Sequence, residues 1–232
     1  MTQENLTVNK SLKVSKKEIL DDFLLMNVSR NISYIGRKEV FMGRAKFGVF
    51  GDGKELPQIA MSKFFRNGDF RSGYYRDQTF MMSINQLTPD QFFAQLYAHT
   101  DIKKDPHSGG RQMNCHFGTR LLNENGDWKT QTDMMNSVSD ISCVSGQMPR
   151  IVGLAYASKL YRNNKNLSDM ENFSINGNEV VFGTIGDAST SEGHFWEAIN
   201  ACGVLQVPLI MSIWDDGYGI SVPSEYHTTR ND

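Results

Sequence analysis

Long apolar runs are the first feature that this sequence of 232 residues lacks. No stretch approaches the roughly 20 apolar residues that a membrane-spanning helix requires. The opening residues, MTQENLTVNK, contain no hydrophobic core of a signal peptide. The sequence therefore predicts a protein that neither spans a membrane nor is exported, and a cytoplasmic location is expected.

Cysteine is scarce, and neither sign of charge is in large excess. The three cysteines, Cys115, Cys143 and Cys202, are odd in number and show no Cys-x-x-Cys spacing, which predicts reduced packing residues. A formal net charge of −2 provides no electrostatic basis for binding nucleic acid. With 39% hydrophobic residues, the chain can bury the core of one large domain or of one domain with an irregular arm.

Three helices are predicted before the middle of the chain. The clearest signal is the capping box formed by Thr88 and Gln91, with Pro89 at the first helical position. The predicted helices cover residues 16–28, with Ser15 as the cap, residues 56–65 and residues 89–98.

A β-α-β unit is predicted near the end of the chain. Residues 180–185 form a short apolar run typical of a buried strand, and Gly186-Asp187 ends it. Ser189 and Glu192 have the spacing of a capping box, which predicts that a helix starts there. Apolar residues at helical spacing follow, and a second apolar run covers residues 207–214.

Acidic residues follow both predicted strands of this unit. Strands of a β-α-β unit are parallel, and ligands gather at their carboxyl ends. Asp187 and Asp216 are therefore expected to face one cation. Mg²⁺ fits better than Ca²⁺ or Zn²⁺, because one or two carboxylates with phosphate oxygens and water complete its octahedron and no Cys/His ligand set is nearby. The pattern predicts a magnesium diphosphate site.

Some of these motifs also have an ordinary structural explanation without a ligand. A lone Gly-Asp after a strand is a common transition into a loop, and Gly51-Asp52-Gly53 is predicted to be a turn because no long apolar run precedes it. His107 and His116 have no third ligand at a recognised spacing, so they are predicted to be loop histidines. The glycine-rich segment between them has no Gly-Lys-Ser/Thr and does not support nucleoside triphosphate binding.

The same region resembles the thiamine diphosphate signature of α subunits of the decarboxylating component of 2-oxo acid dehydrogenase complexes. That signature opens with Gly-Asp-Gly and closes with Asn-Asn; here the opening is Gly186-Asp187-Ala188 and the close is Asp215-Asp216. Trp214 stands where these subunits usually carry an arginine that touches the diphosphate. The resemblance implies cofactor contacts from Gly186, Asp187 and Ala188, and Mg²⁺ ligation by Asp187, Asp216 and Tyr218.

Two segments extend the resemblance to the middle of the chain. Tyr74-Tyr75-Arg76-Asp77 is similar to a segment of branched-chain 2-oxo acid dehydrogenase α subunits, which implies that Tyr75 and Arg76 bind the diphosphate. An arginine fork suits that task. Residues 140–162 resemble the segment that lines the aminopyrimidine and often holds a structural potassium ion, so Ser142 and the backbone of Val144 would contact the pyrimidine.

The resemblance implies an α/β fold of three layers, with a parallel sheet, helices on both faces and an incomplete C-terminal end. Residues 1–35 would form an arm and helix, and residues 36–232 the thiamine diphosphate-binding domain. The enzyme would oxidatively decarboxylate a branched-chain 2-oxo acid with thiamine diphosphate and Mg²⁺.

The implied partners are a lipoyl acyltransferase component, which receives the acyl group, and a β-type subunit or fused β domain in an oligomer. Two alternatives stay open: a pyruvate or acetoin dehydrogenase component, and a catalytically silent module that binds magnesium diphosphate. The family's later catalytic histidine has no counterpart in these residues, so the isolated region is expected to be inactive.

Overall fold

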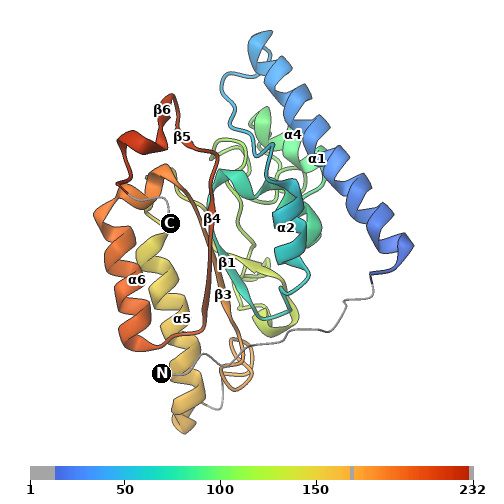
Figure 1. Ribbon diagram of the computed structural model, residues 1–232. Coiled ribbons are helices and arrows are strands. Elements are labelled where there is room, and N and C mark those ends of the chain that lie inside the picture. Colours follow the sequence, from blue (N-terminus) through green and yellow to red (C-terminus); the bar gives the residue numbers. More distant parts are fainter. Residues whose placement is uncertain (1–13, 168–169, 230–232) are drawn as a thin grey trace.

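The computed structural model describes residues 14–167 and 170–229, which form a parallel four-stranded sheet with helices on both faces (Figure 1). The strands lie in the order β2-β1-β3-β4, and each neighbouring pair is parallel. The α/β fold with three layers is confirmed. The strands are β1 (Phe70–Ser72), β2 (Asn136–Ser137), β3 (Val181–Gly186) and β4 (Leu209–Trp214).

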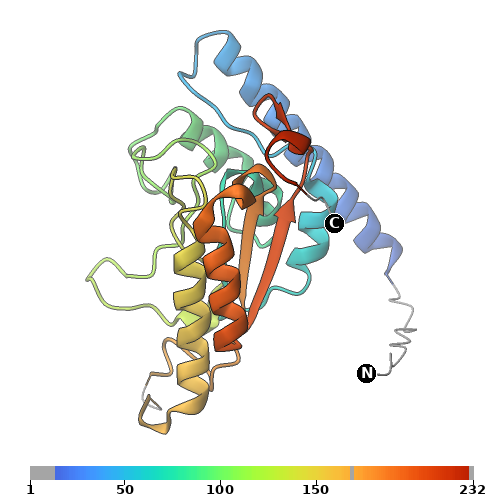
Figure 2. The same cartoon turned by 60° about the vertical axis from the view of Figure 1, so that its left-hand side comes forward.

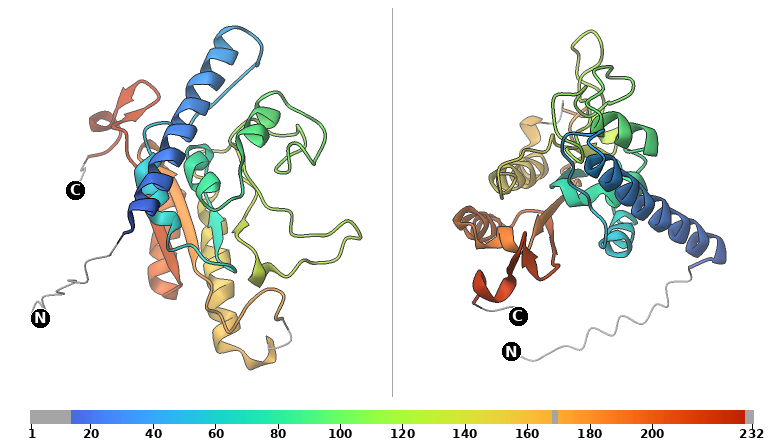
Figure 3. Two further views of the ribbon diagram at one scale, coloured as in Figure 1. Left: turned by 90° about the vertical axis from the view of Figure 1, so that its right-hand side faces the viewer. Right: turned by 90° about the horizontal axis from the view of Figure 1, so that it is seen from above.

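Two helical layers enclose the sheet and bury a separate apolar cluster on each side (Figures 1 and 2). Helices α5 (Met148–Asn163) and α6 (Gly193–Leu205) lie together on one face, as the view from above in Figure 3 shows. The other face is covered by α1 (Lys16–Phe41), α2 (Glu55–Ser62), α3 (Gln78–Ser83) and α4 (Pro89–Leu96).

The predicted β-α-β unit is confirmed as β3-α6-β4, but the predicted start of its helix is wrong. Residues Ala188–Ser191 form a 3-10 turn, and α6 begins only at Gly193. The carbonyl of Ser189 accepts a hydrogen bond from the Ser145 hydroxyl at 2.6 Å. Glu192, the N-cap, makes no capping bond with its side chain. The capping box that the local sequence predicted is therefore absent, and the turn is instead linked to the segment before α5 through Ser145.

The N-terminal helix is longer than predicted. Ser15 caps α1 as expected, because its hydroxyl accepts the Glu18 amide at 3.1 Å, but the helix continues to Phe41. Its buried positions beyond residue 28 include Ser29, Ser33 and Gly36. These small residues recur at helical spacing, but they are not strongly apolar, so the sequence pattern did not mark them as the buried face of a helix.

The helix predicted over residues 89–98 is confirmed with its capping box, although it ends at Leu96 because Ala98 has a left-handed backbone with φ of 53°. The helix predicted over residues 56–65 is α2, shifted towards its N-terminus. Asp52 and Gly53 form the predicted turn.

The predicted division between residues 35 and 36 falls inside α1 and stays a prediction. Residues 1–13 of the predicted arm lie outside the described residues. Within the described ranges, no helix has the length and apolar character needed to cross a membrane. Beyond β4, the chain turns back in a short hairpin of β5 (Tyr218–Gly219) and β6 (Val222–Pro223).

Candidate functional site

The candidate site lies at the carboxyl ends of β3 and β4. Gly186 and Trp214 are paired across the two strands, so Asp187 and Asp215 leave the sheet side by side. The hairpin β5-β6 follows at the same end (Figure 1). The structure thus places Asp187 and Asp216 at neighbouring strand ends, as the strand pattern predicted, and Tyr218 begins the hairpin that follows.

Asp187 carries an atom that the described protein residues leave unpaired. Its Oδ2 atom is buried and has no hydrogen-bond partner among them. Burial raises the pKa of Asp187 above its ordinary value, and the negative charges of Asp216 and Asp215 raise it further. Carboxylates that repel one another in a partly dry site favour a bound cation, since a cation removes both the repulsion and the desolvation cost.

The neighbouring Tyr74 hydroxyl is a second buried polar atom without a partner in the described residues. It lies against Gly186, where an added Cβ would come within 3.1 Å of it. A side chain at position 186 would therefore occupy space beside Asp187. Buried polar atoms are rarely left unpaired, and two at one strand end fit a polar ligand such as a diphosphate with its cation.

Arg76 and Asp216, which the resemblance assigned to diphosphate and metal, bond to each other in the structure. Arg76 Nη2 lies 2.8 Å from Asp216 Oδ2, and both side chains are partly exposed. The guanidinium also sits over the Tyr75 ring, 5.2 Å from its centroid. Lys54 Nζ donates a hydrogen bond to the Asp215 carbonyl. Positive side chains therefore balance part of the acidic group.

Trp214, which stands at the place of the family's arginine, is buried rather than exposed at the strand ends. Its ring is buried, and Nε1 donates to Asp77 Oδ1 at 2.8 Å. The other carboxylate oxygen of Asp77 accepts from Arg71 Nε at 2.7 Å and from Thr184 Oγ1. This buried network joins β1, β3 and β4 directly beneath the Tyr75-Arg76 turn.

Ser142 and Val144 lie on a cavity of about 200 Å³ next to the same turn. His116 Nε2 lies 3.0 Å from the Ser142 hydroxyl, and Tyr74 and Tyr75 line the opposite part of the wall. The loop placement predicted for His116 is correct, but its contact with Ser142 could not be predicted, because nothing in local spacing links two residues on separate loops.

Within residues 14–167 and 170–229, no group of three or more His, Cys, Asp or Glu side chains could hold a metal ion. A cation at the strand ends would therefore take most of its ligands from elsewhere. Mg²⁺ behaves in this way, because it binds through one or two carboxylates and completes its octahedron with phosphate oxygens and water.

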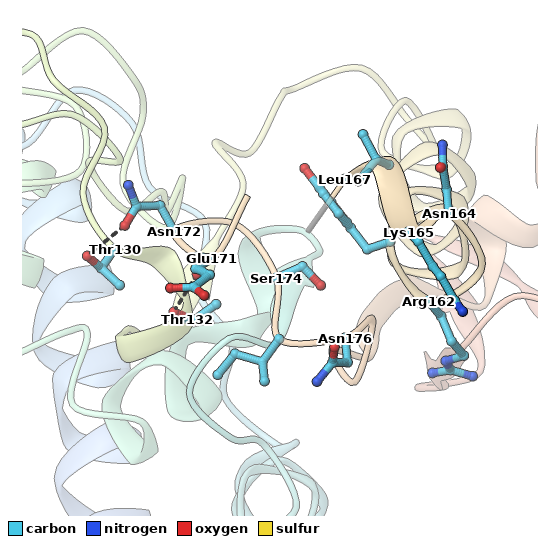
Figure 4. A pocket seen from close by; sticks show the side chains of 12 residues that line it. Thr130, Thr132, Arg162, Asn164, Lys165, Leu167, Glu171, Asn172, Ser174 and Asn176 are labelled. Atoms are coloured by element: carbon cyan, nitrogen blue, oxygen red, sulfur yellow. Dashed lines mark hydrogen bonds between the residues drawn. The ribbon is translucent and has the colours of Figure 1, made fainter. Parts of the chain in front are cut away.

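A cavity of about 940 Å³ lies away from these residues (Figure 4). Its walls include Thr130, Thr132, Arg162, Leu167, Glu171 and Asn176, which precede β3, so it lies towards the amino ends of the strands. None of the predicted site residues lines it, and ligands of parallel sheets gather at the opposite edge.

Comparison with known proteins agrees with this geometry. Residues 25–232 match the family described as "Dehydrogenase E1 component". The chain belongs to this family. Membership implies thiamine diphosphate as the cofactor, which fits the site at the ends of β3 and β4.

Several relatives are α subunits of 2-oxoisovalerate dehydrogenase. The chain is 27% identical over 216 residues to the subunit from Bacillus subtilis (strain 168), which covers 93% of this chain and 56% of the relative. It is 27% identical to the mitochondrial subunits of Caenorhabditis elegans and Homo sapiens, over 86% of this chain in each case and 38% and 37% of the relatives. The chain thus spans about half the length of the bacterial relative, and less of the mitochondrial ones.

Proposed function

We propose that this chain forms the diphosphate-binding side of the active site in an enzyme that oxidatively decarboxylates a branched-chain 2-oxo acid. The observation that carries the proposal is the meeting of Arg76, Asp187 and Asp216 at the ends of adjacent parallel strands, with one Asp187 oxygen left unpaired. Thiamine diphosphate, when bound, supplies the electron sink for loss of CO₂ and carries the acyl group to a lipoyl acceptor.

On this proposal, Asp187 and Asp216 hold Mg²⁺ through carboxylate oxygens, and Tyr218 contributes a backbone oxygen. Arg76 and Tyr75 bind the diphosphate, since the guanidinium fork gives two charge-assisted bonds to one phosphate. Gly186 leaves room for the ligand beside the Tyr74 hydroxyl, and Ala188, at the start of the 3-10 turn that follows, would contact the cofactor.

The cavity beside Ser142 would take the pyrimidine end of the cofactor. The Ser142 hydroxyl, which contacts His116, offers a hydrogen-bonding group, and Val144 lines the same cavity, although its carbonyl already accepts from His194 Nε2 at 3.2 Å. The hydroxyl oxygens of Ser142 and Ser145 are also ligands of the hard type that a structural potassium ion would use.

The branched-chain substrate is proposed because the relatives bear the name 2-oxoisovalerate dehydrogenase. This favours it over pyruvate or acetoin. A β-type subunit or fused β domain would complete the site, and a lipoyl acyltransferase component would receive the acyl group. One observation favours the alternative of a catalytically silent module: Arg76 is already paired with Asp216.

Calorimetric titration of the intact protein with thiamine diphosphate tests the proposal. Binding should require Mg²⁺, and Asp187→Ala should abolish the Mg²⁺-dependent part, because it removes the carboxylate with the unpaired oxygen. Asp127→Asn, on an exposed loop, is the control for loss of one negative charge. Cofactor binding by Asp187→Ala at the affinity of the parent would contradict the metal assignment.

A further inference from the structure

The Arg76–Asp216 ion pair joins the two halves of the proposed ligand site. Arg76 stands on the 3-10 turn Tyr75–Asp77, and Asp216 stands on the loop between β4 and the hairpin. Their 2.8 Å contact is half-buried, with side-chain exposures of 21% and 31%. While it is formed, the guanidinium that would bind a phosphate and the carboxylate that would bind a cation satisfy each other.

The three aspartates around this ion pair oppose the binding of an anionic ligand. Asp187 lies close enough to Asp215 and Asp216 for both charges to raise its pKa, and it leaves the strand next to Asp215. Among the described residues, Arg76 is the only side chain in an ion pair with any of these three aspartates. A diphosphate that approaches without a metal is therefore repelled by the three carboxylates, while the arginine that would bind it is paired with Asp216.

The backbone beneath Arg76 is fixed, so only the side chain needs to move. The Arg76 carbonyl accepts from Gln58 Nε2 at 2.6 Å, and the next residue, Asp77, is held by the buried network. The Tyr75 ring supports the guanidinium from one side. An exchange of partners therefore costs a side-chain rotation and no rearrangement of the turn.

We infer that this ion pair is a latch that makes diphosphate binding conditional on a divalent cation. The inference rests on the proposed function. Mg²⁺ takes over the Asp216 carboxylate, which releases Arg76 to the phosphate that the same cation brings. The latch stabilises the metal-free state, so it increases the factor by which Mg²⁺ strengthens diphosphate binding.

The test is calorimetry of the intact protein with thiamine diphosphate and with inorganic pyrophosphate, each in EDTA and in Mg²⁺. Asp216→Asn keeps the shape of the side chain and breaks the ion pair. It should raise metal-free affinity for both compounds by about three- to tenfold, since a half-exposed ion pair and a repulsive charge are lost together. The Mg²⁺-dependent gain in affinity should shrink accordingly.

Asp215→Asn is the matched control. It removes the same charge one residue away, but the Asp215 side chain accepts from the Gly217 amide at 2.7 Å and does not pair with Arg76. A rise confined to Asp216→Asn supports the latch. An equal rise in both variants, or an unchanged Mg²⁺ effect in Asp216→Asn, overturns it while leaving the proposed function in place. Absence of cofactor binding by the parent in Mg²⁺ removes the proposed function and the latch together.

Discussion

At the scale of single residues, Trp214 illustrates how an unexpected side chain is accommodated. An arginine side chain at position 214 would lie beside Asp77, whose carboxylate already bonds the buried Arg71. The indole instead donates one neutral hydrogen bond to Asp77 and fills the space with apolar surface. Trp214 therefore supports the turn that carries Arg76, the residue to which the proposed function assigns the diphosphate.

Trp214→Phe should destabilise the protein by roughly 1.5–3 kcal/mol, because a buried carboxylate loses a hydrogen bond and the smaller ring leaves space. Urea unfolding followed by circular dichroism measures this loss. Trp196→Phe is the control, since Trp196 is 62% exposed, and its change should stay within about 0.5 kcal/mol. Equal small changes in both variants would show that the Trp214–Asp77 bond contributes nothing.

At the scale of elements, the turn between β1 and η1 (Tyr75–Asp77) depends on a glycine for its close packing. A Cβ at Gly73 would overlap Asp77 Oδ2 and Thr184 Oγ1 and lie 2.7 Å from Arg71 Nη2. These atoms belong to a buried network that cannot move aside without losing its hydrogen bonds. The turn therefore holds the Tyr75-Arg76 segment against the sheet by direct contact.

Gly73→Ala should lower the free energy of unfolding by at least about 3 kcal/mol or prevent folding, since the overlap is with fixed polar atoms. Gly203→Ala is the matched substitution in α6, where nothing lies within 4 Å of the added Cβ. It should stabilise the helix by roughly 0.5–1 kcal/mol. Denaturant midpoints of the two variants on the same side of the parent would refute the packing argument.

Elements with strong local signals could be predicted from the sequence, and those set by distant contacts could not. The capping box at Thr88 and the buried strand β3 follow from neighbouring letters. The capping box at Ser189 did not form: the chain makes a 3-10 turn there, whose Ser189 carbonyl accepts from Ser145 of a different segment. The same limit applies to the site: its strand-end aspartates were predictable, whereas the Arg76–Asp216 and His116–Ser142 contacts arise only in the folded chain.

At the scale of the whole molecule, helices pack on both faces of the sheet, but the edge strand β4 is only partly covered. Both faces are packed by helices, as parallel strands require (Figure 3). Within the described ranges β4 pairs only with β3, and its residues Ile210 and Ile213 are 42% and 48% exposed. Such an edge readily accepts further polypeptide. The candidate site lies at the end of this same strand, so on the proposed function a β-type partner that packs there would also reach the cofactor.

Stability of the whole molecule should depend on pH through His107. Its Nε2 atom is buried, its ring packs against Phe117, and Nδ1 lies 3.0 Å from the Gly118 carbonyl. Burial lowers the pKa of His107; Arg71 lowers it further, and the Gly118 bond and Asp105 oppose the shift. A lowered pKa in the folded state means that the unfolded chain binds the proton first as pH falls.

The contribution of His107 is therefore fully present above the unfolded pKa of about 6.5 and is lost as pH falls towards the folded value, at no more than about 1.4 kcal/mol per pH unit. His107→Asn keeps a donor for the Gly118 carbonyl without a titrating ring, so it should remove this part of the decline between pH 6.5 and 5. Urea unfolding at several pH values gives the difference between parent and variant, in which the contributions of the carboxylates cancel. His99→Asn removes an exposed imidazole; if it flattened the profile equally, the assignment to His107 would be wrong.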